Sequence, residues 1–242
     1  EEEKFPELEK FLLHRLWEVD QIIKKCVKNF NFHLMFTTLL NFCSNDLSAF
    51  YFDIRKDVIY CDNEKSHTRK SSRTLLNIIF NYLVRWFAPS ISFTTEEAWK
   101  AMGNKTSIHL EDFLTCNDTY QNIDINNKWS IVRNIRKVAT GAIEKMRENK
   151  TIRSSLEAHL DIFVSDNIFK KIRDVSFDEI AITSSFKLNT LEDKTNGFEL
   201  EELPNIKVKA TKVIGNKCQR CWKYEERLIN DEICKRCNNA IT

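Results

Sequence analysis

The first half of the chain is dominated by apolar residues that recur every three or four positions, the spacing of one buried face of an α-helix. Pro6 suits the first turn of such a helix, and the pattern runs from there to Phe30. Asn31 predicts the cap of a second helix, whose apolar face continues through Val58. Two long helices are therefore expected before residue 60.

Two further helices are predicted from their boundary residues. Ser71 or Ser72 is placed to cap or begin the third helix, which Pro89 terminates. Thr94 and Glu97 have the spacing of a capping box for a short fourth helix.

These patterns predict a mainly α fold: residues 1–123 form an antiparallel helical bundle, closed by a polar loop over 104–125. Asn126 or Asn127 predicts the cap of a fifth helix. Its apolar stripe consists of Trp129, Val132, Ile135, Ala139, Ala142, Ile143 and Met146.

The hydrophobic period then changes from that of a helix to two, which is typical of strands. Apolar and polar residues alternate from Ala158 to Ser165, and shorter alternations occur at Ile180 with Ile182 and from Ile206 to Ala210. Residues 124–212 are therefore predicted to form a small α+β unit, and 213–242 a separate C-terminal unit.

Composition supports this reading. Gly 4 and Pro 3 are few for 242 residues and charged residues reach 30%, which favours long helices over many short strands. No apolar run approaches the ~20 residues of a membrane span, and the acidic start lacks the apolar segment of a signal peptide. The expected location is the cytoplasm, where thiols stay reduced.

Net charge is only +2, but its distribution is uneven. Residues 128–153 carry eight Lys or Arg against two Glu, and residues 205–242 carry nine against four Asp or Glu. The second half of the chain is therefore where a polyanion is expected to bind.

The cysteines fall into two groups. Cys218 and Cys221 form one CxxC pair, and Cys234 and Cys237 form another after twelve intervening residues. Two such pairs predict one closed tetrahedral Zn²⁺ site of structural type. A redox pair or disulfides are the alternative. The other four cysteines are predicted to be small buried or half-buried hydrophobic residues: Cys26, Cys43, Cys61 and Cys116.

Cations and aromatic rings surround the predicted zinc site. This combination suits phosphate contacts and stacking on an unpaired base. Trp222 directly follows a ligand, so it either stacks on a base or covers the metal, and the cations either contact nucleic acid or form a solvated face. The predicted RNA-binding residues are Arg133, Arg136, Lys137, Arg220, Trp222, Lys223 and Arg236.

Signatures of catalysis are absent from the sequence. Neither GxGxxG nor GxxxxGK[ST] occurs, and the five histidines are scattered. Asp46, Asp53 and Asp57 lie close together, but neighbouring Arg55 and Lys56 favour ion pairs over catalysis. No catalytic residue is predicted.

One segment has a specific family resemblance. Residues 41–57, NFCSNDLSAFYFDIRKD, and Tyr60-Cys61-Asp62 closely resemble the anticodon-binding domain of isoleucyl-tRNA synthetases. Segments 86–89 (WFAP), 93–99 (FTTEEAW) and 154–158 (SSLEA) fit the same family, and the two CxxC motifs resemble the zinc finger of its bacterial form. Arg153 stands where the family usually has Gly, so the turn there is expected to differ.

The resemblance implies a class I synthetase anticodon-binding fold that holds the anticodon stem-loop of tRNA(Ile). It implies a parent ligase that joins isoleucine to tRNA using ATP, in catalytic and editing domains absent from this sequence, and a monomer without an obligate protein partner. Two other interpretations stay open: a zinc-finger DNA-binding repair or processing module, and a helical protein–protein scaffold.

Overall fold

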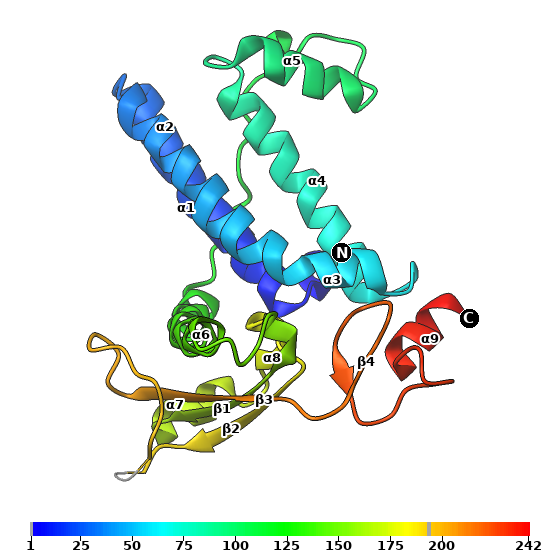
Figure 1. Cartoon of the computed structure of the whole chain (residues 1–242). Coiled ribbons are helices and arrows are strands. Elements are labelled where there is room, and N and C mark those ends of the chain that lie inside the picture. Colours follow the sequence, from blue (N-terminus) through cyan, green and yellow to red (C-terminus); the bar gives the residue numbers. More distant parts are fainter. Residues whose placement is uncertain (1, 193–194) are drawn as a thin grey trace. The chain divides into compact units, whose positions relative to one another are not determined.

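The computed structural model describes residues 2–192 and 195–242, and its elements group into two compact units. The first unit contains residues 1–51 and 65–123, and the second contains 52–64 and 124–242. The structure is mainly helical with one small mixed sheet, as the sequence predicts (Figure 1). The three-part division at 123/124 and 212/213 stays a prediction.

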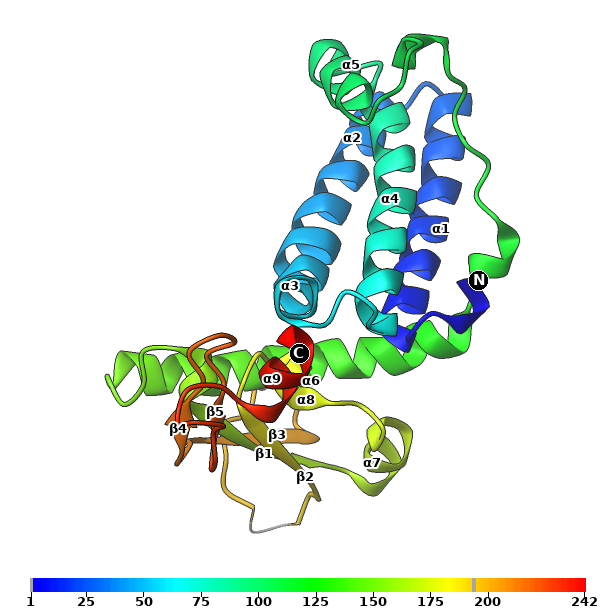
Figure 2. The same ribbon diagram turned by 90° about the vertical axis from the view of Figure 1, so that its right-hand side faces the viewer.

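The first unit is helical. Its elements are η1 (Glu2–Lys4), α1 (Glu7–Lys28), α2 (Phe32–Asn41), the π-helix η2 (Phe42–Phe52, of which Phe52 belongs to the second unit), α4 (His67–Phe87), α5 (Ser92–Ala101), and the 3-10 turns η3 (Ile108–Leu110) and η4 (Asp118–Tyr120). Helices α1, α2 and α4 lie side by side (Figure 2). Their apolar faces meet at residues such as Phe11 and Phe50, whose rings pack edge to face at 6.1 Å. Burying each such side chain stabilises the unit by about 1.5–3 kcal/mol.

A buried carboxylate ties three elements of this bundle together. Glu9 on α1 is fully buried, and its Oε1 accepts hydrogen bonds from Tyr51 Oη and Ser72 Oγ, each at 3.0 Å. A buried charge needs such donors to offset the lost hydration. Ser71 and Ser72 lie early in α4, which is one of the two positions expected for them, and neither is its cap. The cap is Ser66, whose hydroxyl accepts from the Arg69 amide.

Two other predicted helix starts also differ from the structure. Helix α5 begins at Ser92 without a side-chain cap, so Thr94 and Glu97 form no capping box. Glu96 instead accepts a hydrogen bond from the Ile108 amide at 2.9 Å, which ties α5 to η3. The fifth helix, α6, begins at Ile123 rather than after Asn126 or Asn127. In each case a polar residue near a helix start resembles a cap in sequence but lies within the helix.

The π-helix η2 occupies much of the segment that carries the family resemblance. Its buried positions are Phe42, Asp46, Leu47, Phe50 and Tyr51. Phe42, Asp46 and Phe50 recur every four residues, and Leu47 and Tyr51 repeat the same step. A π-helix of this length is rare, and the 3.6-residue period of an α-helix does not predict one.

The second unit is α+β with a cysteine-rich tail. Its elements are α3 (Asp53–Cys61), α6 (Ile123–Glu148, whose first residue is counted with the first unit), η5 (Ser155–Glu157), β1 (Ala158–Val164), α7 (Asp166–Ile172), α8 (Phe177–Ile180), β2 (Ser185–Thr190), β3 (Ile206–Lys212), β4 (Asn216–Lys217), β5 (Tyr224–Glu225) and α9 (Lys235–Ile241). Strand β1 is central in a three-stranded sheet, parallel to β2 and antiparallel to β3. Helix α6 runs across one side of this sheet (Figure 2).

The predicted strand at Ile180 and Ile182 is wrong. Ile180 ends the short helix α8, where it is buried together with Phe177 three residues earlier, and Ile182 has a φ of +57°. The second strand along the chain is instead β2, at one edge of the sheet. Its sequence does not clearly predict a strand, because Phe186 and Leu188 are its only apolar residues.

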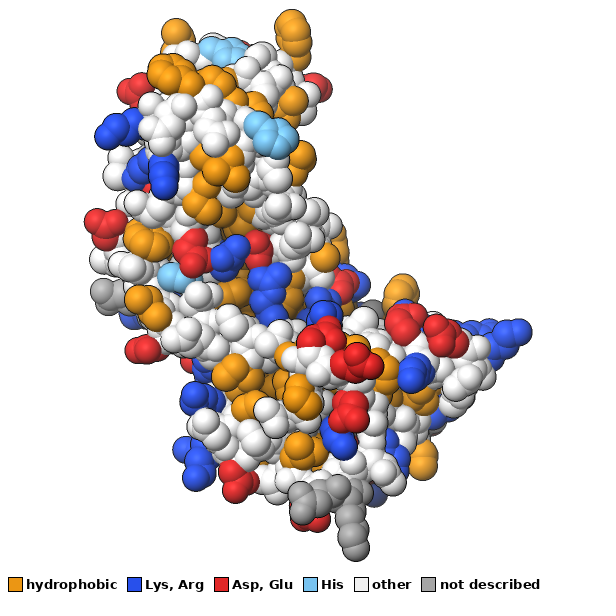
Figure 3. Space-filling model, turned by 90° about the vertical axis from the view of Figure 1, so that its left-hand side faces the viewer, with side chains coloured by type: hydrophobic (Ala, Val, Ile, Leu, Met, Phe, Trp, Pro, Cys, Tyr) orange, Lys and Arg blue, Asp and Glu red, His pale blue; other side chains and the backbone are white. Residues whose placement is uncertain are grey.

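Charged side chains of both signs are interspersed on the face drawn in Figure 3. The separate cysteines behave as predicted: Cys26 and Cys116 are buried and Cys43 and Cys61 half-buried. In the part of the chain that the structure describes, no helix is long and apolar enough to cross a membrane.

Candidate metal centre and nucleic-acid interface

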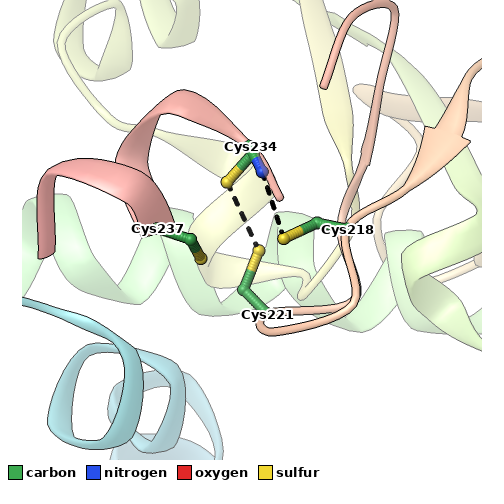
Figure 4. Close-up of side chains that lie close together, drawn as sticks. All are labelled: Cys218, Cys221, Cys234 and Cys237. Carbon is green, nitrogen blue, oxygen red and sulfur yellow. Dashed lines mark hydrogen bonds between the residues drawn. The ribbon is translucent and has the colours of Figure 1, made fainter. Parts of the chain in front are cut away.

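The four tail cysteines converge on one point. Cys218 and Cys221 lie in the turn after β4, Cys234 is the N-cap of α9, and Cys237 lies in its first turn (Figure 4). Their four Sγ atoms lie within 4.8 Å of one another, and all four residues are buried. The CxxC spacing places both members of each pair on the same side of a turn, so the two pairs face each other.

The geometry of this cluster fits a tetrahedral thiolate ligand set. With metal–sulfur bonds of ~2.3 Å, the sulfurs of a zinc tetrahedron lie about 3.8 Å apart. The Sγ atoms of Cys221 and Cys234 are 3.7 Å apart. Cys218 Sγ accepts a hydrogen bond from the Cys234 amide at 3.3 Å. Burial opposes ionisation of Cys218, but backbone N–H donors outweigh it and lower the pKa to about 6. The site can therefore hold a metal ion, and its sulfur ligands suit a soft or borderline one.

Trp222 projects from this cluster rather than covering it. Its backbone has a φ of +66°, which is rare for a bulky residue, and its amide donates to the Cys218 carbonyl at 2.9 Å. The residue is 60% exposed, with the Lys217 ammonium 5.4 Å from the ring centroid. The side chains that do pack against the sulfurs are those of Cys61, Leu228 and Ile233.

The cations of the tail are held by groups of the same unit. Arg236 donates to both carboxylate oxygens of Asp57 on α3, to Oδ1 at 2.9 Å. Arg220 donates to the Cys61 carbonyl at the end of α3, and Lys223 lies 2.7 Å from Asp178 Oδ2 on α8. These bonds attach the tail to α3 and α8.

The two carboxyl groups that pair with tail cations have lowered pKa values. Burial opposes ionisation of Asp57 and Asp178, yet the pKa of each is lowered because Arg236 and Lys223, respectively, stabilise the charged forms. Both pairs are therefore ionised near neutral pH.

The three predicted RNA-binding residues of α6 differ in exposure. Arg136 Nε donates to the Ile180 carbonyl at 2.9 Å, and Nη2 to Asp53 Oδ2 at 2.8 Å. Lys137 is exposed and pairs with exposed Glu202 at 2.9 Å. Arg133 is half-buried and also has an interaction partner. Arg136 is thus held at two points within its unit.

The three grouped aspartates form ion pairs, as predicted. Asp46 pairs with Arg15, Asp53 with Lys56 and Arg136, and Asp57 with Arg236. Except for Lys56, these partners are far away in sequence, so the spacing of the aspartates indicates pairing without identifying the partner. Asp178, two residues after Ser176 in α8, has no distinguishing motif that would predict its role in holding Lys223.

Comparison with known proteins identifies the family. Residues 9–162 match the family described as the anticodon-binding domain of tRNA ligase. This chain belongs to that family. Its similar relatives include isoleucine–tRNA ligases of Pelagibacter ubique (43% identical over 96% of the chain), Bartonella henselae (39% over 93%) and Bradyrhizobium diazoefficiens (35% over 94%).

The chain spans about a quarter of the length of these ligases, 24%, 24% and 23% respectively. It therefore corresponds to the anticodon-binding part of such a ligase, and membership of this family implies tRNA binding.

Proposed function

We propose that this chain is the part of an isoleucine–tRNA ligase that holds the anticodon stem-loop of tRNA(Ile). The family match over residues 9–162 carries this proposal, and the identity to isoleucine–tRNA ligases supports the choice of tRNA. In the parent enzyme, ATP-dependent attachment of isoleucine takes place in domains outside this chain, and the chain itself contributes no catalytic residue. The protein is cytoplasmic and monomeric and needs no protein partner.

The metal in this proposal is one structural Zn²⁺ held by Cys218, Cys221, Cys234 and Cys237. Four thiolates leave no open position for a catalytic water, so the ion stabilises the fold. Residues 213–242 contain little apolar core, and metal binding therefore supplies much of their folding free energy. We treat these residues as a zinc finger that follows the bundle (1–123) and the α+β unit (124–212).

The predicted RNA-binding residues have two tasks in this proposal. Trp222 stacks on an unpaired base, because its side chain is exposed and Lys217 lies over only one face of the ring. Exposed Lys137 contacts phosphate. The remaining predicted residues act by holding the tail and α6 in place against the RNA: Arg133, Arg136, Arg220, Lys223 and Arg236.

Binding measurements on the 242-residue chain test the proposal. Fluorescence anisotropy would compare the tRNA(Ile) anticodon stem-loop with the same stem carrying another anticodon, an unrelated RNA hairpin and duplex DNA, each at low and moderate salt. Tighter binding of the tRNA(Ile) stem-loop, weakened by salt, is expected. Preference for duplex DNA would favour a repair or processing module, and no salt-dependent binding would favour a protein scaffold. Either result overturns the proposal.

A further inference from the structure

The three-stranded sheet of the second unit has one buried face and one half-open face. Along β1, buried residues alternate with half-buried ones. Because side chains alternate across a strand and paired residues share a face, the register assigns nine positions to the half-open face. They form three rows across β2, β1 and β3: Ser185–His159–Thr211, Lys187–Asp161–Lys209 and Asn189–Phe163–Lys207.

This face carries cations that are not held by partners. Lys187 and Lys209 are exposed, and among the described residues neither has an ion pair or hydrogen bond from its ammonium. Lys207 is half-buried and lies 3.3 Å from Glu199. Asp161 is the one acidic residue among the nine positions. The face is therefore positive overall, and its two outer lysines are available to a ligand.

Asp161 lies between these lysines in the central row, and the rows on either side of it each place a ring on β1. Phe163 is half-buried on the central strand. His159 lies in the other outer row, where Nδ1 is 2.8 Å from Ser185 Oγ and Nε2 is 3.7 Å from Asp161 Oδ1. Hydroxyl and amide groups of Ser185, Thr211 and Asn189 complete the surface.

We propose that this face binds unpaired nucleotides of the RNA that the chain holds, with Lys187 and Lys209 contacting phosphates and Phe163 stacking on a base. The inference rests on the proposed function and extends it to a surface separate from the metal-bearing tail. Charge complementarity selects the partner, because two uncommitted lysines and the Phe163 ring of the adjacent row lie on one face of the sheet, with the hydroxyls of Ser185 and Thr211 in the row beyond Asp161. Cationic surfaces with aromatic side chains bind single-stranded nucleic acid without needing a particular sequence. The alternative is a solvated face on which Lys187 and Lys209 only neutralise Asp161.

The first test removes the two lysines. Lys187→Ala/Lys209→Ala is compared with Lys170→Ala/Lys171→Ala, which removes the same charge from exposed positions of α7 in the same unit. Affinity for full-length tRNA(Ile) transcript is measured between low and moderate salt. The sheet variant should bind roughly tenfold more weakly, with a salt slope smaller by about 1.4–1.8, whereas the α7 variant should change far less. Equal losses in the two variants would overturn the inference.

The second test uses two substitutions on the same face that should change RNA affinity in opposite directions. Asp161→Asn removes the acidic group and should tighten binding, a result that a destabilised sheet would not give. Phe163→Leu keeps an apolar side chain but removes the stacking ring, and should weaken binding roughly tenfold. Unchanged affinity in both variants, with the wild type binding, rejects the sheet surface and leaves the proposed function intact. Failure of the wild type to bind tRNA rejects both.

Discussion

The cations of the cysteine-rich tail and those of the sheet face differ in what surrounds them. In the tail, Arg236 and Lys223 are each held by a carboxylate of α3 or α8. On the sheet, Lys187 and Lys209 have no such partner within the described residues. Both regions contain Lys or Arg in sequence, and their presence alone does not tell which cations are available to RNA. The three-dimensional pairing decides it.

The largest expected effect concerns the four-cysteine cluster, where we propose that zinc binds. Cys221→Ser should abolish stoichiometric zinc binding and unfold residues 213–242, because structural zinc sites contribute on the order of 10 kcal/mol. Metal analysis and hydrogen exchange of the purified chain measure the two effects. Cys61→Ser is the matched control, since Cys61 packs against the cluster without belonging to it. Retained zinc in Cys221→Ser would contradict the ligand set.

The clustering of the four cysteines and the helical stripes were predictable because they depend on residues close together in sequence. Four cysteines in two CxxC pairs specify a site whatever surrounds them, and the stripe from Trp129 to Ile143 is buried as its period predicts. The partner of Arg236 was not predictable, since Asp57 is 179 residues away. Strand β2 is formed by pairing with β1, and its own sequence carries only a weak alternation.

Trp222 is expected to give the next largest effect. Trp222→Ala should weaken binding of the anticodon stem-loop by about 1–3 kcal/mol, the usual contribution of an aromatic ring stacked on a base. Trp222→Phe keeps an aromatic ring at the same left-handed backbone position and should retain most of the affinity. Titration of labelled stem-loop measures both variants, with zinc content checked in each. Equal affinity of the alanine variant and the wild type would show that the exposed indole does not contact RNA.

Breaking the Asp57–Arg236 pair should move stability and RNA affinity in opposite directions. Asp57→Asn should lower the free energy of unfolding by about 1 kcal/mol, a modest value because the Arg236 side chain is 38% exposed. The same change leaves Arg236 with only the more distant carboxylate of Asp62, 3.7 Å from Nη1, and should tighten RNA binding. Denaturant unfolding and anisotropy measure the two quantities. A simultaneous loss of both would mean that the pair shapes the RNA-binding surface.

This pair also has an expected pH dependence. The pKa of Asp57 is lowered in the folded protein, so its stabilisation is fully present above the unfolded value of about 4. It is lost as pH falls through the folded pKa, where the carboxylate takes up a proton. The difference in unfolding free energy between wild type and Asp57→Asn should therefore be constant near neutral pH and shrink below about pH 4. A difference that grows on acidification would contradict the assignment.

The smallest effect is expected at Lys223. Its ammonium lies 2.7 Å from Asp178, and both side chains are less than a quarter exposed. Lys223→Ala should therefore leave the salt dependence of RNA binding almost unchanged.

Lys137 is the contrasting residue, because its pair with Glu202 is exposed and contributes little. Lys137→Ala should reduce the salt slope by about one. An equal reduction of the salt slope in Lys223→Ala and Lys137→Ala would mean that the Lys223–Asp178 pair opens when RNA binds. Pairing in the free protein would then not determine which cations contact RNA.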